Sequence, residues 1–398
     1  MISIIVSMAR RLVVMVKSYG IVSTVRLIWI LISNMMYLEE KDYDFVLLPT
    51  EKRGEGKHLP KGPLTLTWFI PDFDVGSGGH TTIFRIISLL QVLGHKSTIV
   101  LIPPTKFQNR GKALEVVVRH FVTEFTGEFM FWGEELPESD VVIATSWQTA
   151  YYVNSLGGSA GRFYFVQDFE PHFFPMGSLY VFAENTYRLG LKCLAASPWL
   201  ANLLRENYGA QAASFDLAYS PGQYFPMNIT RKPKTVLFYA RHLTVRRGFE
   251  LGILALKLLK RAAPDVEVIL FGATAYPNIP FPCTCLGVLS HEELLRLYNM
   301  ATVGLVISLT NYSLIPNEMM ACRLPVVDME TECMSMIYRN GVDIVLAPPD
   351  PHRIASAILS LLQDDSFRET IAKNAHQAVT RLTWEKTAQR IDELIRNL

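Results

Sequence analysis

Short apolar runs alternate with longer amphipathic segments along most of this chain. In the first half the apolar runs fall at 64–70, 97–102, 141–146, 162–168, 191–197 and 214–220. In the second half they fall at 236–240, 266–273, 303–308, 324–327 and 342–347. Apolar strands separated by helix-length spacers are typical of parallel sheets covered by helices on both faces. The pattern predicts an α/β protein with two such sheets in succession.

A polar stretch, Arg231-Lys-Pro-Lys234, separates the two halves and reads as a hinge. We therefore predict a first domain over 64–230 and a second over 231–384, followed by a closing helix. Helices are predicted at 81–93 and 351–362, and another amphipathic helix ends near residue 259.

The second half contains a strand, a polar loop and a helix in immediate succession. The run 303–308 ends at Asn311 and Tyr312, and a short helix is predicted to open at Pro316 with Glu318 in its first turn. Ligands of α/β proteins bind at the carboxyl edge of the sheet, and a helix N-terminus favours phosphate. Proline is well accommodated in a first helical turn. Glu318 also has a structural explanation, because an acid in a first turn complements the helix dipole.

The run from Glu318 to Val327, EMMACRLPVV, resembles the donor-site helix of retaining family 4 glycosyltransferases. Their pattern contains two glutamates: the second falls on Glu318, and the first falls on Thr310 here. The resemblance implies that Glu318 binds the donor ribose and that an acid usually placed near the donor sugar is missing. Arg323 stands where the family usually has glycine.

This resemblance implies the GT-B fold, with two Rossmann-like domains facing a cleft and a C-terminal helix, 385–398, that crosses back to the first domain. It also implies that the loop and helix after 303–308 contact the donor. The residues predicted there are Thr310, Asn311, Tyr312 and Pro316.

A glycine-rich loop follows the first predicted strand and ends in Gly78-Gly79-His80. Glycines let a ligand approach the backbone closely at a helix N-terminus. The spacing is not G-x-G-x-x-G and no acid ends the second strand, so a nicotinamide dinucleotide is not predicted. The family resemblance implies that Gly78 and Gly79 contact the donor and that His80 faces the acceptor. His80 could equally cap the helix.

Main-chain contacts to the nucleotide base are implied for the segment that contains Gly287 and Leu289. Ser290 and Glu293 in the same segment form a capping-box pattern, a compatible structural explanation.

Three arginines follow the strand at 236–240. Basic side chains between a strand and a helix suit a diphosphate leaving group. The family pattern is Gly-Arg-Leu, a spacer and Lys-Gly; Arg241 matches its arginine, and Arg247 or Arg246 matches its lysine. The alternative is that these are ordinary surface arginines.

Two acids and a histidine follow the apolar run at 162–168, among aromatic residues. Asp168, Glu170 and His172 are candidates for acceptor binding or proton handling. This segment, and the later Ser197-Pro198 helix start, resemble the WsaF branch of family 4, the rhamnosyltransferases of bacterial surface-glycan assembly. The structural alternative is a folded loop in which Asp168 caps a turn.

Composition narrows the function classes. The chain has 398 residues, is 49% hydrophobic and 19% charged, and carries a formal net charge of +1. A nearly neutral chain does not favour nucleic-acid binding as the main function. Its five scattered cysteines show no zinc or redox spacing, and an odd number without a framework favours a reducing compartment.

The first 38 residues carry four basic side chains and no acid. We expect residues 1–50 to form a basic, apolar helical extension, divided at Gly20. No uncharged run reaches the roughly 20 residues that span a bilayer, and no cleavage site suggests a secretory signal. Such a segment reads as an in-plane membrane anchor. The alternative is a helical extension that packs on the protein or on a second protomer.

The sequence thus predicts a nucleotide-sugar-dependent glycosyltransferase of the retaining type, acting at a bacterial surface glycan. The best candidate donor is dTDP-L-rhamnose; the acceptor is a glycan or lipid-linked glycan; and neither metal nor nucleic acid is required. We expect it in the cytoplasm or at the inner face of the cell membrane, with oligomerisation left open. The alternatives are a GT-B nucleotide-sugar 2-epimerase and a non-catalytic assembly scaffold, which Thr310 favours.

Overall fold

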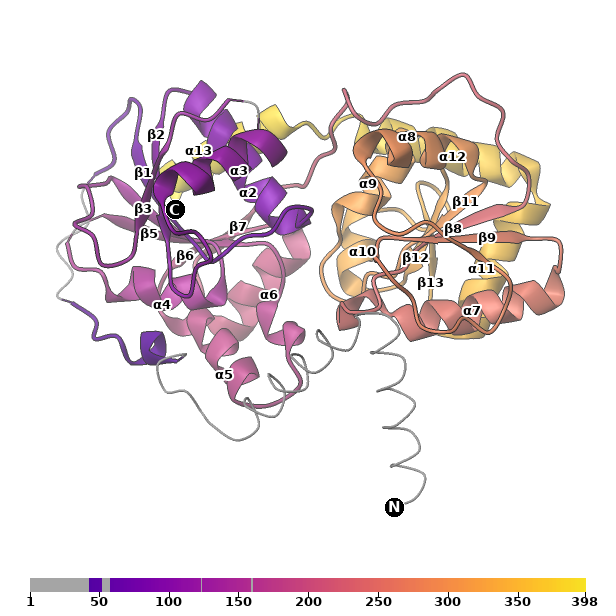
Figure 1. The fold of residues 1–398 in the computed structure, drawn as a ribbon, viewed down its shortest axis with the longest axis horizontal. Helices are drawn as coiled ribbons and strands as arrows, with labels where there is room; N and C mark the ends of the chain where they lie inside the picture. Colours follow the sequence, from indigo (N-terminus) through magenta and orange to yellow (C-terminus); the bar gives the residue numbers. More distant parts are fainter. Residues whose placement is uncertain (1–42, 52–57, 123, 159) are drawn as a thin grey trace, which may run out of the picture.

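The computed structural model describes residues 43–51, 58–122, 124–158 and 160–398. Two parallel sheets, each flanked by helices, form two domains that lie side by side (Figure 1). The predicted α/β class and GT-B architecture are confirmed. The predicted extension over 1–50 lies largely outside the described residues. In the part of the chain that the structure describes, no helix is long and apolar enough to cross a membrane.

The first domain has a seven-stranded sheet within the described ranges, in the order β3-β2-β1-β4-β5-β6-β7. Its strands are β1 (Thr65–Ile70), β2 (Lys96–Leu101), β3 (Glu128–Phe131), β4 (Val141–Ala144), β5 (Gly161–Val166), β6 (Lys192–Ala195) and β7 (Ala212–Ser214). Its helices are η2 (Asp44–Leu47), α2 (Gly78–Val92), α3 (Arg110–His120), α4 (Trp147–Ser155), η3 (Glu170–Phe173), α5 (Ser178–Asn185), η4 (Thr186–Arg188) and α6 (Pro198–Tyr208).

The second domain has a sheet of six described strands, in the order β10-β9-β8-β11-β12-β13. Its strands are β8 (Thr235–Tyr239), β9 (Glu267–Phe271), β10 (Thr284–Cys285), β11 (Val303–Leu305), β12 (Val326–Met329) and β13 (Val345–Ala347). The helices are η5 (Val245–Arg247), α7 (Phe249–Ala262), α8 (His291–Met300), α9 (Leu314–Ala321), α10 (Glu332–Ile337), α11 (Pro351–Gln363), α12 (Asp365–Val379) and α13 (Trp384–Asn397).

The strand order reverses at one place in each sheet, between β1 and β4 and between β8 and β11. In open α/β sheets, ligands bind outside the carboxyl ends of the strands at this switch point. The loops after β1, β8 and β11 carry the glycine-rich, arginine-rich and Asn311 segments respectively. The topology therefore places three of the predicted site segments at the two switch points.

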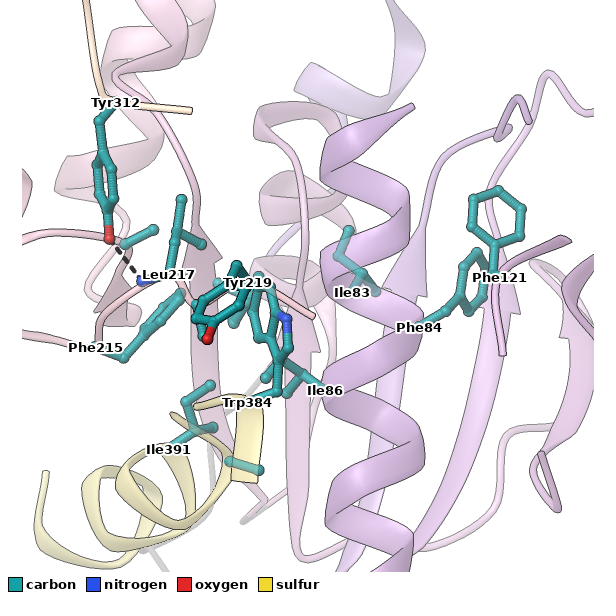
Figure 2. Close-up of a cluster of buried hydrophobic side chains, with 14 of the residues drawn as sticks. Ile83, Phe84, Ile86, Phe121, Phe215, Leu217, Tyr219, Tyr312, Trp384 and Ile391 are labelled. Carbon is teal, nitrogen blue, oxygen red and sulfur yellow. Dashed lines mark hydrogen bonds between the residues drawn. The ribbon is translucent and has the colours of Figure 1, made fainter. Parts of the chain in front are cut away.

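The last apolar run of the first half is not a strand along its length. β7 ends at Ser214, and Phe215, Leu217 and Tyr219 continue as a buried loop. Figure 2 shows Tyr312 of the second domain above Leu217, whose backbone N donates a hydrogen bond to the Tyr312 hydroxyl at 2.6 Å. Phe215 stacks on Phe165 of β5 in the first domain. The run is apolar because its side chains are buried, against the first sheet at Phe215 and beside Tyr312 at Leu217. The predicted strand at 214–220 was therefore wrong beyond β7.

The start of α9 also differs from the prediction. The helix begins at Leu314, so Pro316 is its third residue and Glu318 its fifth. Glu318 therefore lies beyond the first turn, and the helix N-terminus that offers free N–H groups is at Ser313 and Leu314. β3, a strand at the edge of its sheet, was not among the predicted elements.

The C-terminal helix α13 packs on α2 of the first domain. Trp384 at its start is buried, and Arg85 of α2 lies over its ring at 5.0 Å from the centroid. Figure 2 shows Trp384 close to Ile86 of α2, with Ile391 in the next turns of α13. The far end is fixed by Arg396, which donates hydrogen bonds to carbonyls of the segment before β1. This helix therefore ties the two domains together.

Candidate functional site

The loop after β8 presents a concentration of positive charge at the carboxyl edge of the second sheet. Arg241 is exposed, whereas Arg246 and Arg247 are half-buried. Burial lowers the pKa of Arg246; the nearby Asp168 raises it, and the charges of Arg247 and Arg241 lower it further. The three guanidinium groups are thus close enough for their charges to act on one another. Together they make this edge of the sheet positively charged, which favours binding of a diphosphate.

Arg247 lies toward the interior of the second domain. Its Nη1 is buried without a hydrogen-bond partner among the described residues. Its charge also acts on Asp328, which is buried and accepts hydrogen bonds from Ser308 N (2.8 Å) and Ser308 Oγ (2.9 Å). Burial raises the pKa of Asp328 to about 7, and those hydrogen bonds and Arg247 oppose the rise. Asp328 therefore fixes the loop after β11 through Ser308.

Asp168 crosses the boundary between the domains. Its Oδ2 accepts a hydrogen bond from Thr310 Oγ1 at 2.9 Å, and its Oδ1 accepts one from Asn311 N at 3.0 Å. Arg246 Nε lies 3.3 Å from Oδ2 as an ion pair, although the N–H is not aligned for a hydrogen bond. Oδ1 also accepts from Phe169 N, so the turn-capping alternative describes part of its role.

The predicted donor-binding residues of the loop after β11 are occupied by contacts to the first domain. Asn311 Nδ2 donates to the carbonyls of Gln167 (2.8 Å) and Ala196 (2.7 Å). Thr310, Asn311 and Tyr312 are all buried. Their side chains therefore join the domains in this structure instead of facing open space.

Glu170 is placed differently from the prediction. It is buried, and its carboxylate accepts hydrogen bonds from Tyr164 Oη (2.6 Å) and Trp147 N (2.9 Å) inside the first domain. Burial raises its pKa to about 7 despite these donors. Glu170 therefore holds η3 onto the sheet. The prediction that it contacts an acceptor is corrected, because its carboxylate is buried inside the first domain. His172 is exposed, with its ring 4.7 Å from that of Phe169.

The glycine-rich loop of the first domain leads from β1 into α2. Gly78 and Gly79 are its first residues and are exposed, and Ser77 Oγ caps the helix by accepting from His80 N. The capping alternative for the His80 side chain was therefore wrong. Its Nδ1 is buried without a partner in the described structure, and burial lowers its pKa to about 4, against the pull of Asp74 and Asp72.

Glu318 faces a group that the sequence analysis missed. Burial raises its pKa to about 7, while Arg85 of α2 and the hydroxyls of Tyr224 and Tyr298 lower it. Its Oε2 has no hydrogen-bond partner among the described residues. One signal was present in the sequence: Arg85 follows Gly78 by seven residues, two helical turns along the same face.

The remaining predicted positions, Gly287, Leu289 and Pro316, belong to the second domain. Gly287 adopts φ +76°, a conformation that favours glycine, and its carbonyl accepts from Gly272 N at 2.7 Å. Leu289 is half-buried, and Ser290 with Glu293 forms the expected capping box at the start of α8. Pro316 is buried within α9.

No group of three histidine, cysteine or acidic side chains among the described residues is arranged to hold a metal ion. The groups described above are the arginines after β8, the free amides at the start of α9 and the carboxylates of Asp168 and Glu318.

Two family models match this chain. The model described as WsaF, C-terminal domain, matches residues 234–359, and the model described as WsaF, N-terminal domain, matches residues 128–196. The chain thus matches the models of both WsaF domains, one in each domain of its GT-B fold. The predicted resemblance to the WsaF branch is confirmed, and the WsaF C-terminal match includes the basic loop, the loop after β11 and Glu318.

Among curated proteins, this chain is 32% identical over 339 residues to the O-antigen biosynthesis protein RfbC of Myxococcus xanthus. The match covers 82% of this chain but 26% of RfbC, so the chain spans about a quarter of that relative.

Solved structures show the same fold at low identity. Sucrose-phosphate synthase from Thermosynechococcus elongatus has a TM-score of 0.65 at 16% identity, covering 83% of this chain and 98% of that one. Anabaena HepE in complex with UDP-glucose has a TM-score of 0.64 at 16% identity, covering 84% and 100% respectively.

Proposed function

We propose that this chain is a glycosyltransferase that moves a sugar from a nucleotide-sugar donor to a growing bacterial surface glycan. The observation that carries the proposal is the convergence of three guanidinium groups in the loop after β8, where the charges of Arg247 and Arg241 act on Arg246 and Asp168 pairs with Arg246 from the first domain. A site with this excess of positive charge favours a diphosphate. The WsaF domains and the likeness to RfbC support the same reading.

In the proposed mechanism the leaving diphosphate lies beside Arg241, Arg246 and Arg247. Negative charge builds on the β-phosphate as the glycosidic bond breaks, and guanidinium groups fixed beforehand stabilise that charge most. The free amides at the start of α9, near Ser313 and Leu314, add partial positive charge.

Glu318 is the proposed partner of the hydroxyls of the nucleoside sugar, which are two in UDP and one, the 3′-hydroxyl, in dTDP. One of its carboxylate oxygens is buried without a protein partner, which leaves an acceptor that a hydroxyl can satisfy. Gly287 and Leu289 are the proposed main-chain contacts of the base. Anabaena HepE, which shares the fold, has been solved with UDP-glucose.

For the donor we propose dTDP-L-rhamnose, with retention of configuration, on the strength of the WsaF domains. For the acceptor we propose a glycan of the O-antigen class, free or lipid-linked, because RfbC is described as an O-antigen biosynthesis protein. We propose that the enzyme acts in the cytoplasm or peripherally at the inner membrane face, through the basic residues 1–38.

One observation favours a scaffold without catalysis. Thr310 stands where the family resemblance places an acid, and its hydroxyl is used in the contact with Asp168. The scaffold and the enzyme differ in whether a nucleotide binds.

A thermal-shift panel of dTDP, UDP and GDP, each with its common sugars, tests the proposal. A ligand at about 100 times its Kd stabilises the folded state by about 2.7 kcal/mol. A clear rise in Tm with one nucleotide supports a transferase and identifies its donor class. The variant Arg241→Gln should reduce that rise, and Asp265→Asn, at an exposed ion pair with Lys234, serves as the control. No rise with any nucleotide contradicts the proposal and favours the scaffold.

A further inference from the structure

Arg246 is held by side chains of the other domain. Its Nε lies 3.3 Å from Asp168 Oδ2, and its guanidinium carbon lies 4.0 Å from the ring centroid of Phe173. Both partners follow β5 in the first domain, whereas Arg246 belongs to η5 of the second. The position of this arginine therefore depends on contact between the domains.

These contacts leave the terminal nitrogens of Arg246 available. Asp168 approaches Nε and Phe173 covers one face, while neither Nη atom has a hydrogen-bond partner among the described residues. Guanidinium groups bind phosphate through parallel N–H groups, and a side chain already held in place loses less conformational entropy on binding. Arg246 is thus oriented with its phosphate-binding end unoccupied.

Asp168 is in turn fixed by the second domain. Thr310 Oγ1 donates to one carboxylate oxygen and Asn311 N donates to the other. The side chain is 12% exposed. A carboxylate surrounded by protein donors in this way has little surface left for an acceptor sugar.

We propose that Asp168 is a positioning residue, which orients Arg246 for the donor diphosphate when the two domains close. Thr310 and Asn311 are the groups that hold the carboxylate in place. The inference rests on the proposed function and replaces acceptor binding as the role of Asp168. It makes the diphosphate site complete only when the domains are in contact, so donor binding and closure favour each other.

A double-mutant cycle tests whether Asp168 acts through Arg246. The variants are Asp168→Asn, Arg246→Gln and the pair, and the measurement is the release of nucleoside diphosphate from the donor in the presence of acceptor. Each single substitution should lower kcat by about tenfold or more, the size expected for one charged interaction. If Asp168 acts through Arg246, the Asp168→Asn change already misplaces Arg246, and replacing that arginine as well removes nothing more. The kcat of the double variant should therefore be no lower than that of the worse single variant.

Additive losses in kcat, or an Asp168→Asn variant that changes only the KM of the acceptor, would overturn the inference. Asp265→Asn is the matched control, since it removes the charge of an exposed aspartate. A wild-type protein that turns over no donor refutes the proposed function instead, so the two failures are distinguishable.

Amide hydrogen exchange gives a readout that needs no substrate. The backbone N–H of Asn311 donates to Asp168, so Asp168→Ala should speed its exchange by about tenfold or more if that contact holds the loop. An unchanged exchange rate at Asn311 contradicts the role given to Asp168, whatever the activity.

Discussion

Replacing Glu318 with glutamine separates the charge of this side chain from its shape. The carboxylate has one oxygen without a protein partner and faces Arg85 across the domain boundary. If Glu318 accepts hydrogen bonds from ribose hydroxyls, Glu318→Gln should weaken the binding of UDP by about 1.5–3 kcal/mol, the range for a hydrogen bond to a charged group. At 1.36 kcal/mol for each factor of ten, this is a loss of about 10- to 150-fold.

The raised pKa of Glu318 adds a pH dependence with a definite sign. Burial brings the pKa to about 7, so the better acceptor, the ionised form, predominates at pH 8 and is the minority at pH 6. If only the ionised form binds ribose, UDP affinity through this group should fall about tenfold from pH 8 to pH 6. A 2′-deoxynucleotide such as dTDP offers one hydroxyl fewer and should show a smaller effect of the substitution.

Isothermal titration of UDP and dTDP at both pH values measures these differences. The phosphate groups titrate in the same range, so the useful quantity is the ratio of wild-type to Glu318→Gln affinity at each pH, in which that titration cancels. The ratio should be large at pH 8 and close to one at pH 6. A folded Glu318→Gln variant that binds UDP as tightly as the wild type at pH 8 would refute the assignment. Equal ratios at the two pH values would show that another group titrates.

Three further predictions concern stability. Burial raises the pKa of Glu170 from an ordinary 4.5 to about 7, so its contribution to stability falls as the pH rises between those values. The Tm of Glu170→Gln should therefore fall less than that of the wild type between pH 5 and pH 8, and a larger fall would contradict this. A methyl group added at Gly252 would lie 2.2 Å from Phe238, so Gly252→Ala should lower Tm at a cost of about 1–3 kcal/mol, whereas Gly62→Ala, with open space around it, should not. Arg231 donates four hydrogen bonds to carbonyls at the ends of α8 and α9, and Arg231→Gln should lower Tm by more than the control Asp265→Asn; equal Tm values would show that those bonds contribute little.

The two sheets could be predicted because their strands are buried on both faces. β4 reads as a continuous apolar run and β8 very nearly so, and their burial follows that pattern closely. Local chemistry also fixed the capping box at Ser290 and the helix start at Ser197 and Pro198. In each case the residues that determine the structure are neighbours in the sequence.

The buried loop after β7 shows where such patterns fail. Phe215, Leu217 and Tyr219 alternate as a strand does and are buried, yet they belong to a loop: Phe215 stacks on Phe165 of β5, and Leu217 N donates to Tyr312 of the second domain. A period of two records which side chains are buried, not what buries them. A buried apolar loop can therefore have the alternating sequence of a strand although it pairs with no neighbouring strand. The predicted start of α9 was wrong for a related reason. Proline is accepted within the first turn of a helix, so Pro316 does not mark the first residue.

The two acids after β5 show why the site itself needed the structure. Asp168 and Glu170 are two residues apart, and in an extended chain both would point to the same side. The strand ends at Val166 and η3 begins at Glu170, so the backbone turns between them. Asp168 is directed to Thr310, 142 positions away, while Glu170 turns back to Tyr164. Composition identified an acidic segment at a strand end, but which acid meets the other domain depends on how two sheets are brought together. The same arrangement brings Asp168 and Phe173 of the first domain against Arg246 of the second. The basic loop and Asp168 therefore lie together only where the two domains are in contact.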